Sequence, residues 1–514
     1  MAKHYDVVVL GAGIGALSTA ALLARRSWRV LVLGQGERPA HYVYDKLPHA
    51  RRPFTFLAGA SPAWARILAE LAQSQTFRRH VRSLDPMLQV LEPRVRLEIP
   101  PDSQLFGREL DREFPEVRRV VDELYAELAR TNEVVDAAFQ RDVVWPPGTF
   151  WERRETSRVA ATMPHFHEGA KDLLAEFPHE HPYRSVVLTT VRFASDLAPP
   201  FPPLSVARLH GAWTRGVSEL LRGEADVTDF LVDRVRAHGG DARLGERASY
   251  IATRHGKVTG VVLEGDEEVT GVQFVVTEGS SPSVLELARD YRPSRRALDA
   301  RPELALESNR FVTSFLVRRE GLPAPLATES FLLSGSAPDR AVAPIVHLQI
   351  SPDERTPEGM VLLVAESFVS GRLEPKDLAR TRASVVAVVE SFLPFIERHY
   401  VAIDSPHDGL PLWDYRSGKR VLVDRTKVRP GGGTVEAETM VPQLRVHGGS
   451  LEGVGGEPIR FPLAGAFGVG RSILPGLGQE GELLAAWGAA RTITRTDRKK
   501  EKMRREMWSK VELG

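Results

Sequence analysis

The chain has 514 residues, carries a net charge of +1 and contains no cysteine. Its length is sufficient for a large hydrophobic core and predicts two or three domains. The balanced charge does not favour a nucleic-acid partner, and the absence of cysteine excludes disulfides, thiolate catalysis and cysteine metal sites. No apolar run approaches the roughly 20 residues that span a bilayer. The first predicted strand starts so early that it leaves no room for a signal peptide, so we expect a cytoplasmic protein.

The most informative pattern lies near the N-terminus. An apolar strand at residues 7–10 leads directly into Gly11-x-Gly13-x-x-Ala16, and a helical stretch follows over residues 17–26. This order is typical of a dinucleotide-binding unit. In such a unit the first glycine permits the tight turn, the second lets the backbone approach a pyrophosphate, and the third, small residue allows helix and strand to pack. The helix N-terminus then offers free N–H groups and the positive end of its dipole to the phosphates.

The second predicted strand, residues 29–33, is followed by an unusual segment. An acidic residue about 20 residues after the glycines normally binds a ribose hydroxyl, but Gly34 stands at this position and the nearest carboxylate is Glu37. Gln35 can offer a hydrogen bond to a ribose, but not a charge-assisted one. An alternative interpretation is therefore that this strand–turn–helix unit keeps its fold but has lost affinity for its ligand.

Periodicity and turn residues predict the remaining elements in chain order. We expect helices over residues 61–80, 111–140, 218–238 and 377–400 and from about residue 481. Ser61 and Pro62 fit the N-cap and first position of the earliest of these helices. Strands are expected over residues 248–253, 258–263, 267–270 and 272–277. The dipeptides His255-Gly256 and Gly265-Asp266 suit two-residue hairpin turns.

Three blocks of the sequence resemble one family. They are residues 6–26, residues 216–278 with their Gly239-Gly240 pair, and residues 463–481 with Leu-Ala-Gly-Ala and Pro-Gly-Leu-Gly-Gln-Glu-Gly. In this order they resemble the flavoprotein amine-oxidase-like clan, and specifically its phytoene desaturase and carotenoid isomerase branch. The resemblance implies an α/β fold, with a Rossmann-like domain that has a doubly wound, mostly parallel sheet and an inserted α+β substrate domain.

The resemblance also implies a division of the chain and a cofactor. The FAD-binding domain would comprise residues 1–85, 205–290 and 455–493. The substrate domain would comprise residues 86–204 and 291–454, and residues 494–514 would form a basic helical tail. In the glycine loop, FAD would be held by Gly11, Gly13, Ile14, Gly15 and Ala16. Gln35 and Arg38 would substitute for the missing acid, and the backbone of Ala248 would lie at the adenine. The C-terminal block would surround the ribityl chain and ring with Gly465, Ala466, Gly476, Gly478 and Gly481.

Two positions depart from the family pattern in ways that weaken the cofactor site. Gly34 and Ala466 stand where the family has acids. Each lost charged hydrogen bond costs about 1.5–3 kcal/mol, or roughly one to two decades of affinity. Glu482 beside a phosphate or a flavin carbonyl would add an unfavourable charge. FAD is therefore the expected cofactor, with an affinity reduced by these changes.

The leading hypothesis for function is an FAD-dependent oxidoreductase resembling phytoene desaturases. It would act on a long apolar isoprenoid or lipid-like substrate by hydride transfer to the flavin, which carries the difficult chemistry. The sequence names no catalytic residue. Two alternatives stay open. One is a flavin-free or weakly binding pseudoenzyme that serves as a scaffold or binding protein, and the other is a carotenoid-type isomerase that uses reduced flavin.

Three further features have both a functional and a plain interpretation. His165, His167, His179 and His181 form two His-x-His pairs, but loop histidines are usually solvated, so we expect no metal site. Trp145, Phe150, Trp151 and Phe166 either line an apolar tunnel or pack a core. The tail after residue 494 combines basic residues with Met503, Met507 and Trp508. This suits an amphipathic helix in peripheral contact with an anionic membrane, or simply a solvated helix end.

Overall fold

The computed structural model describes residues 3–166, 172–334, 345–370, 375–424 and 437–511. A five-stranded, wholly parallel sheet organises the first part of the fold, with the order β10-β3-β2-β14-β23. Its strands are β2 (Val7–Leu10), β3 (Val30–Leu33), β10 (Asp241–Arg243), β14 (Phe274–Thr277) and β23 (Ala466–Gly468). The expected Rossmann-like α/β fold with a parallel sheet is thereby confirmed.

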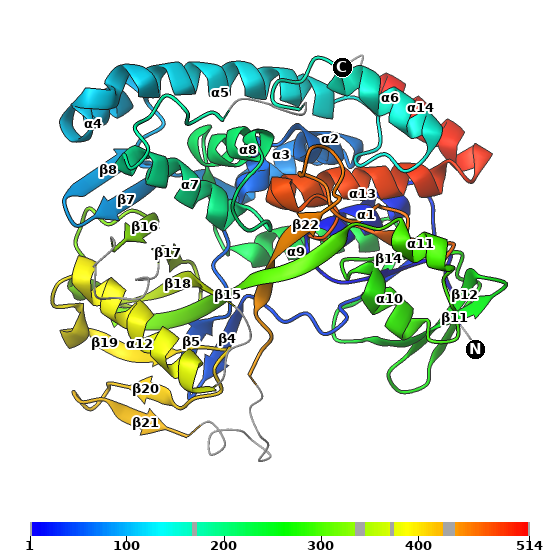
Figure 1. Cartoon of the computed structure of the whole chain (residues 1–514). Helices are drawn as coiled ribbons and strands as arrows, with labels where there is room; N and C mark the ends of the chain where they lie inside the picture. Colours follow the sequence, from blue (N-terminus) through cyan, green and yellow to red (C-terminus); the bar gives the residue numbers. More distant parts are fainter. Residues whose placement is uncertain (1–2, 167–171, 335–344, 371–374, 425–436, 512–514) are drawn as a thin grey trace.

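Three helices pack together on this sheet. They are α1 (Ile14–Arg25), α9 (Glu224–Ala237) and α13 (Gly478–Thr494), and α1 contacts both of the others (Figure 1). Because β3 lies on one side of β2 and β14 on the other, the strand order reverses at β2. Ligands of open α/β sheets bind in the crevice at such a reversal, beyond the carboxyl ends of the strands. The glycine loop after β2 lies at this point.

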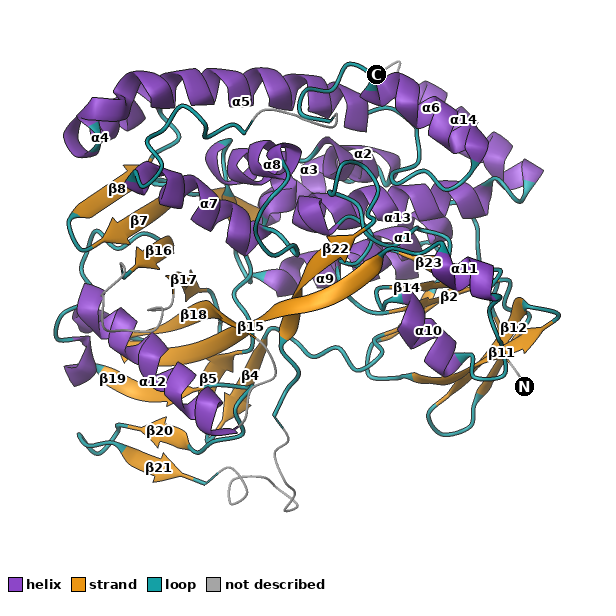
Figure 2. Cartoon of the chain, in the orientation of Figure 1, coloured by secondary structure: helices purple, strands orange, loops and turns teal. Residues whose placement is uncertain are grey.

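A second, ten-stranded sheet forms the opposite half of the molecule (Figure 2). Its order is β21-β20-β19-β15-β18-β17-β16-β7-β8, and β22 also pairs with β15. These strands are β7 (Leu88–Glu92), β8 (Val95–Ile99), β15 (Glu303–Arg318), β16 (Glu329–Leu333), β17 (Ile345–Ser351), β18 (Met360–Ser370), β19 (Tyr400–Asp404), β20 (Leu412–Asp414), β21 (Val421–Val423) and β22 (Val441–His447). All of these strands come from residues 88–99 and 303–447. The domain boundaries proposed from the sequence stay a prediction.

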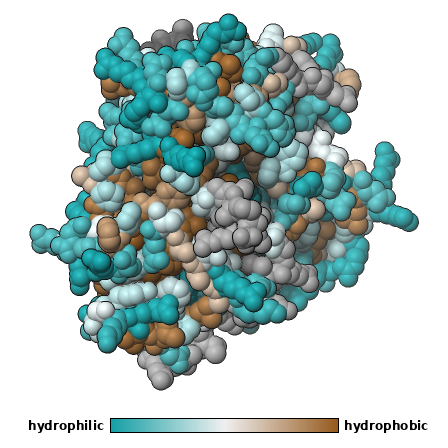
Figure 3. All heavy atoms as spheres, turned by 60° about the vertical axis from the view of Figure 1, so that its left-hand side comes forward, coloured by the Kyte–Doolittle hydropathy of each residue, from teal (hydrophilic) through white to brown (hydrophobic). Residues whose placement is uncertain are grey.

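Helices surround the ten-stranded sheet on two sides. Above it in Figure 2 lie α4 (Ser103–Glu113), α5 (Arg118–Phe139), α7 (Pro182–Ala194) and α8 (Pro203–Thr214), while α12 (Pro375–Phe392) covers its lower face. Figure 3 shows that apolar side chains gather along the middle of this half of the molecule and are bordered by hydrophilic ones. The remaining short elements are β4 (His41–Tyr44), β5 (Leu47–Ala50), β6 (Val81–Ser83), β9 (Ser218–Leu220), α10 (Ser281–Leu287) and α11 (Arg295–Asp299).

A small four-stranded sheet contains the predicted hairpins. It comprises β1 (Lys3–His4), β11 (Ala248–Arg254), β12 (Lys257–Leu263) and β13 (Glu268–Thr270). In the turn between β11 and β12, His255 and Gly256 have φ values of 50° and 72°. Two consecutive positive φ values match the right-handed twist of the flanking strands. Both predicted hairpins are confirmed.

Several predicted helices differ from the observed ones. Ser61 does cap α2 (Pro62–Glu70) by accepting a hydrogen bond of 3.2 Å from the amide of Ala63. The helix then stops, since Ala72 has a φ of 55°, and a separate α3 (Ser74–Phe77) follows. The expected helix over 111–140 is divided at Phe114-Pro115, because the residue before a proline avoids the helical region.

The other corrections concern helix ends. Residues 218–238 begin as strand β9, and α9 starts only at Glu224. The last long helix starts at Gly478, earlier than predicted, and α12 ends at Phe392. At residues 218–220 strand pairing replaces the predicted start of the helix, and after Phe392 other structure replaces its predicted end, whereas α13 is longer than predicted.

The basic tail forms α14 (Arg498–Val511) and packs on the fold. The buried Arg504 guanidinium donates to Asp142 at 3.0 Å and to Glu501 at 2.9 Å. The ammonium group of Lys500 lies 3.5 Å from the ring centre of Trp28. Within the described ranges of the chain, no helix is long and apolar enough to cross a membrane.

Candidate functional site

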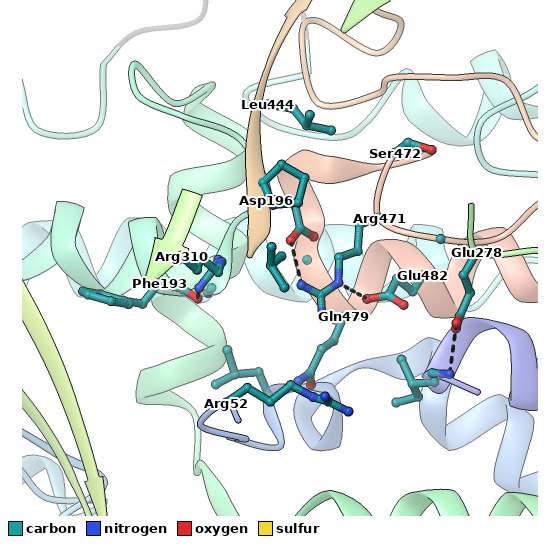
Figure 4. A pocket seen from close by; sticks show the side chains of 18 of the residues that line it. Arg52, Phe193, Asp196, Glu278, Arg310, Leu444, Arg471, Ser472, Gln479 and Glu482 are labelled. Carbon is teal, nitrogen blue, oxygen red and sulfur yellow. Dashed lines mark hydrogen bonds and ion pairs between the residues drawn. The ribbon is translucent and has the colours of Figure 1, made fainter. Parts of the chain in front are cut away.

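A cavity of about 640 Å³ lies where the glycine loop faces the ten-stranded half of the molecule. This volume falls within the range of small-molecule sites, about 300–1,000 Å³. Its wall comes from the glycine loop, from residues 52–57 after β5, from the C-terminal end of α7 and from the loop that leads into α13. Figure 4 shows the charged side chains that converge on it.

The amide groups of the glycine loop are already bonded to carboxylates of the chain itself. Glu278 accepts hydrogen bonds from the backbone N–H of Gly13 at 3.0 Å and of Ala16 at 3.1 Å (Figure 4). Glu37 accepts one from the N–H of Ala12 at 2.9 Å. Gly13 and Ala16 are among the residues that the sequence assigned to a pyrophosphate.

The sheet explains why Glu278 reaches this loop. It is the first residue after β14, and β14 runs parallel to β2, so both strands end at the same edge. The backbone N–H of Glu278 donates to the carbonyl of Leu10 at 3.1 Å. On its other side the Glu278 carbonyl lies so close to Gly470 that a Cβ there would collide with it. The backbone of Glu278 is therefore fixed from both sides.

The loop glycines are fitted to this carboxylate. A Cβ on Gly13 would lie 2.5 Å from Oε1 of Glu278, and one on Gly11 would collide with Oε2. Gly11 also has a φ of 122°, which L side chains rarely adopt. Gly15 faces the carbonyl of Val469 in the same way. Close approach of the chain to itself thus accounts for each glycine of the motif.

The position of the missing ribose acid is closed by backbone. A Cβ on Gly34 would collide with the carbonyl oxygen of Leu244. No side chain, acidic or otherwise, fits there without a shift of the segment after β10. A Cβ on Gly36 would likewise collide with the guanidinium of Arg247.

Two residues predicted to contact the adenosine bind each other instead. The side-chain amide of Gln35 donates to the carbonyl of Ala248 at 3.0 Å, and its oxygen accepts from the N–H of Ala248 at 2.9 Å. The backbone groups assigned to the adenine are thereby satisfied. The prediction for Arg38 near ribose or phosphate is wrong, because its guanidinium pairs with Glu438 at 2.8 Å.

The C-terminal block lines the cavity with Gly470, Arg471, Ser472, Gly478 and Gln479, but most of the residues predicted there to hold FAD lie elsewhere. Ala466 is buried in β23 and Gly465 precedes it with a φ of 93°. A Cβ on Gly476 would meet the hydroxyl of Ser205, and one on Gly481 would meet the carbonyl of Leu474. Of the thirteen predicted cofactor residues only Gly13, Ile14 and Gly478 line the cavity among the described residues.

The residues present therefore do not fit FAD. The amides of Gly13 and Ala16 have a carboxylate partner, no acid for a ribose fits at position 34 because of the Leu244 carbonyl, and both backbone groups of Ala248 are bonded to Gln35. Burial and the charge of Glu37 also raise the pKa of Glu278 to about 8, although the two amide donors lower it.

The remaining cavity is strongly charged, with seven carboxyl and four guanidinium groups in its wall. Among the charged side chains that the structure describes there, only Asp196, Arg471 and Glu482 form no hydrogen bond. The Arg471 guanidinium lies between the two carboxyls, 3.7 Å from Asp196 and 4.0 Å from Glu482 (Figure 4). We call these three residues the charged triad.

The pKa values of all three residues of the charged triad are shifted upward. Burial raises the pKa of the Asp196 carboxyl and raises that of Glu482 well above its usual value. Burial opposes the charge of Arg471, but the neighbouring Asp196 and Glu482 raise its pKa further. The triad can donate through the guanidinium and accept through two carboxyls, which suits a ligand with charged groups of both signs.

The sequence pointed to the cavity but missed most of the residues that define it. Glu278 and Asp196 have no motif of their own. In the sequence, Arg471 can be recognised only as a charged residue within a glycine-rich segment. The one usable signal for Glu278 was its place directly after an apolar strand beside β2, where side chains reach the crevice.

The other candidate features do not contribute to the site. His165 pairs with Glu127 at 3.2 Å and His181 with Glu116 at 2.8 Å, while His167 lies outside the described residues. The part of the chain that the structure describes holds no group of residues arranged for a metal ion. Trp145 packs against Phe139 in the core, and Phe150 and Trp151 are 68% and 67% exposed. The interpretation of these aromatic side chains as a tunnel is wrong.

Comparisons with known proteins agree with the fold. Residues 9–71 match the model of the NAD(P)-binding Rossmann-like domain. A search of curated protein sequences finds no match. Among solved structures, a putrescine oxidase variant with redesigned cofactor binding aligns with a TM-score of 0.58 and 14% identity, covering 96% of this chain and 100% of that one. An oxidoreductase from Methanosarcina mazei aligns with a TM-score of 0.55 and 16% identity, covering 93% and 98%.

A third structure extends this comparison to a further amine oxidase. Cyclohexylamine oxidase from Brevibacterium oxydans aligns with a TM-score of 0.52 and 16% identity, covering 96% of this chain and 99% of that one. The chain thus shares the fold of these oxidoreductases over nearly its full length. At these identities the likeness concerns the fold alone, and function has to be argued from the site.

Proposed function

We propose that this protein is a flavin-free binding protein with the fold of an FAD-dependent oxidoreductase, and that it binds a small charged molecule in the central cavity. The observation that carries the proposal is the closed adenosine end of the site. There the Leu244 backbone abuts Gly34 and the Gln35 amide bonds both backbone groups of Ala248. Binding of the adenine to the Ala248 backbone would require the Gln35 contact to break, and no acid for the ribose fits at position 34.

The charged triad supports the class of ligand. Asp196 and Glu482 offer acceptors to a cationic group, and Arg471 offers donors to an anionic one. Beyond the triad, Phe193, Trp213 and Leu444 add apolar wall. A ligand with a zwitterionic head and a short apolar body satisfies both parts, and a wholly apolar substrate would leave the triad without hydrogen bonds at a cost.

The experiment starts with the purified protein and its flavin content. We expect a colourless protein that releases no FAD on denaturation and whose melting temperature does not rise with excess FAD. A ligand that binds only the folded state at 1,000 times its Kd stabilises that state by about 4.1 kcal/mol. Stoichiometric FAD, or a stabilisation of that size, would contradict the proposal.

A second measurement tests the ligand class. Lysine, putrescine and succinate serve as zwitterionic, cationic and anionic probes in thermal unfolding. We expect lysine to stabilise the protein most, and the exchange Arg471→Gln to remove this effect. The matched exchange Arg355→Gln on the surface should leave it unchanged. Equal stabilisation of both variants would show that lysine binds elsewhere.

One observation favours a second candidate, the FAD-dependent oxidoreductase that resembles phytoene desaturases or the related reduced-flavin isomerase. Gly13 and Ile14 still face the cavity at the N-terminus of α1. If FAD binds, assays of isoprenoid desaturation and of double-bond isomerisation separate these two activities. Peripheral membrane contact through α14 also stays a prediction. Cosedimentation with anionic vesicles tests it.

A further inference from the structure

The ten-stranded sheet brings a buried histidine–carboxyl pair to the wall of the cavity. Nε2 of His347, on β17, lies 2.6 Å from Oε2 of Glu329, on the neighbouring strand β16. His347 is 3% exposed and Glu329 is 2% exposed, and His347 lines the cavity. A histidine whose ring is oriented by a buried carboxyl can offer its second nitrogen to a ligand.

The Glu329 carboxyl is fixed by two further donors. Its Oε1 accepts hydrogen bonds from the hydroxyl of Thr55 at 2.9 Å and from the side-chain amide of Gln349 at 2.7 Å. The oxygen of the Gln349 amide in turn accepts from the backbone N–H of Phe54 at 2.9 Å. Since a carboxylate accepts hydrogen bonds and does not donate them, the hydrogen of a neutral imidazole lies on Nε2 here, and Nδ1 is left as an acceptor.

Three aromatic rings hold the imidazole of His347 in place. The Phe331 ring stacks on it with centroids 4.9 Å apart, and the rings of Trp213 and Phe193 lie at 5.7 Å and 5.4 Å. Among the residues that the structure describes, none bonds Nδ1 of His347, and this atom is not sealed in the core. Because His347 lines the cavity, Nδ1 is open to it.

The charged groups next to His347 are already paired with each other. Glu366 stands opposite His347 on β18, and its carboxyl accepts a hydrogen bond of 2.7 Å from Arg310. The same guanidinium donates to the backbone carbonyls of Phe193 and Ser195. Nδ1 of His347 therefore remains available to a ligand.

We propose that His347 is a specificity-determining residue, and that the cavity binds a phenolic amino acid or a closely related compound. This inference rests on the proposed function for the zwitterionic head at the charged triad, and adds the other end of the ligand. His347 contacts Phe193, which lies on the other side of the triad from Glu278 (Figure 4). An acceptor among aromatic rings favours a donor carried on a flat apolar body, because a buried polar group without a partner costs free energy. A phenol combines that body with that donor.

The first test compares four amino acids by isothermal titration of the wild-type protein. Tyrosine and 4-aminophenylalanine carry a donor at the end of the ring, whereas phenylalanine and 4-methoxyphenylalanine do not. We expect the first two to bind about fivefold more tightly than the last two, which is the ratio that one ordinary hydrogen bond gives. Equal affinities, or no binding of any of the four, would overturn the inference.

A variant shows whether His347 is the acceptor. His347→Phe keeps an aromatic ring but removes Nδ1, and we expect it to lose the preference for tyrosine while its affinity for phenylalanine stays the same. The double variant with Glu329→Gln serves if the unpartnered carboxyl prevents folding. His447→Phe, at an exposed position of β22, is the matched control and should keep the preference. A preference that survives in a folded protein without His347 would overturn the inference.

A ligand without the zwitterionic head separates this inference from the proposed function. p-Cresol has the phenol alone, so we expect His347→Phe to weaken its binding about fivefold and Arg471→Gln to leave it unchanged. If p-cresol behaves in this way but lysine does not stabilise the protein, the role of His347 stands and the proposed function fails. If lysine stabilises the protein but His347→Phe does not weaken binding of p-cresol, the inference fails and the proposed function stands.

Discussion

The raised pKa of Glu278 predicts how the stability of the fold depends on pH. Its carboxyl faces the Glu37 carboxyl, the two loop amides and, more distantly, Arg471; burial and Glu37 raise its pKa from 4.5 to about 8. A folded-state pKa above the unfolded one means that the folded state binds the proton more tightly. The contribution of Glu278 to stability is therefore complete below pH 4.5 and is lost as the pH rises through 8.

The size of this effect follows from the same values. The difference between 4.5 and about 8 corresponds to about 5 kcal/mol as an upper limit. Because Glu278 is partly open to the cavity, solvent screens it, and we expect about 2–3 kcal/mol. Glu278→Gln removes the titration but keeps the shape; because the charge of Glu278 also raises the pKa of Glu482, the difference between the two proteins reports Glu278 together with its effect on Glu482.

The assay is denaturant unfolding of wild type and Glu278→Gln between pH 5 and pH 9, followed by fluorescence and circular dichroism. At pH 5 we expect Glu278→Gln to be less stable by about 1 kcal/mol, because one amide loses its acceptor. At pH 9 the order should reverse, and the variant should be the more stable protein. A difference between the two proteins that stays constant across this range would refute the assignment of a raised pKa to Glu278.

Three further predictions concern the contacts that close the site and support the second sheet. Gly34→Ala should cost more than about 2 kcal/mol of unfolding free energy because its Cβ collides with the Leu244 carbonyl, whereas Gly245→Ala, whose Cβ meets nothing within 4 Å, should be close to neutral. Gln35→Ala should cost about 1–2 kcal/mol through its two bonds to Ala248, with no gain of FAD binding in equilibrium dialysis; a gain would show that Gln35 alone excludes the adenosine. Arg382→Met should cost about 3–5 kcal/mol in denaturant unfolding, because it leaves the wholly buried Asp408 without its arginine, while Arg119→Met at the exposed pair with Glu123 should cost under about 1 kcal/mol. If the two arginine variants lost the same unfolding free energy, burial would not explain how much an ion pair contributes to stability.

The sequence predicts the parallel sheet and the hairpins because their signals are local. The apolar runs of β2, β3 and β14 are buried on both faces, and His255-Gly256 has the residues that its turn needs. The ends of helices were predicted less well, as at Ala72, where a left-handed residue ends α2 without a glycine or proline to mark it. The site itself depends on contacts between residues more than 200 positions apart, such as Gln35 with Ala248 and Gly13 with Glu278. Spacing along the chain carries no information on such pairs.

The persistence of the glycine motif has its own explanation in these contacts. A motif of this kind reports the path of the backbone, since Gly11 and Gly13 are needed wherever an oxygen approaches the turn closely. In this protein the approaching oxygens belong to Glu278, and a Cβ at either glycine would meet them. The constraint on both positions is therefore the same with a carboxyl of the chain as with a phosphate of a cofactor. A match to the Rossmann-like pattern over residues 9–71 thus identifies the fold, and the residue that follows β14 decides whether the loop is free to bind a nucleotide.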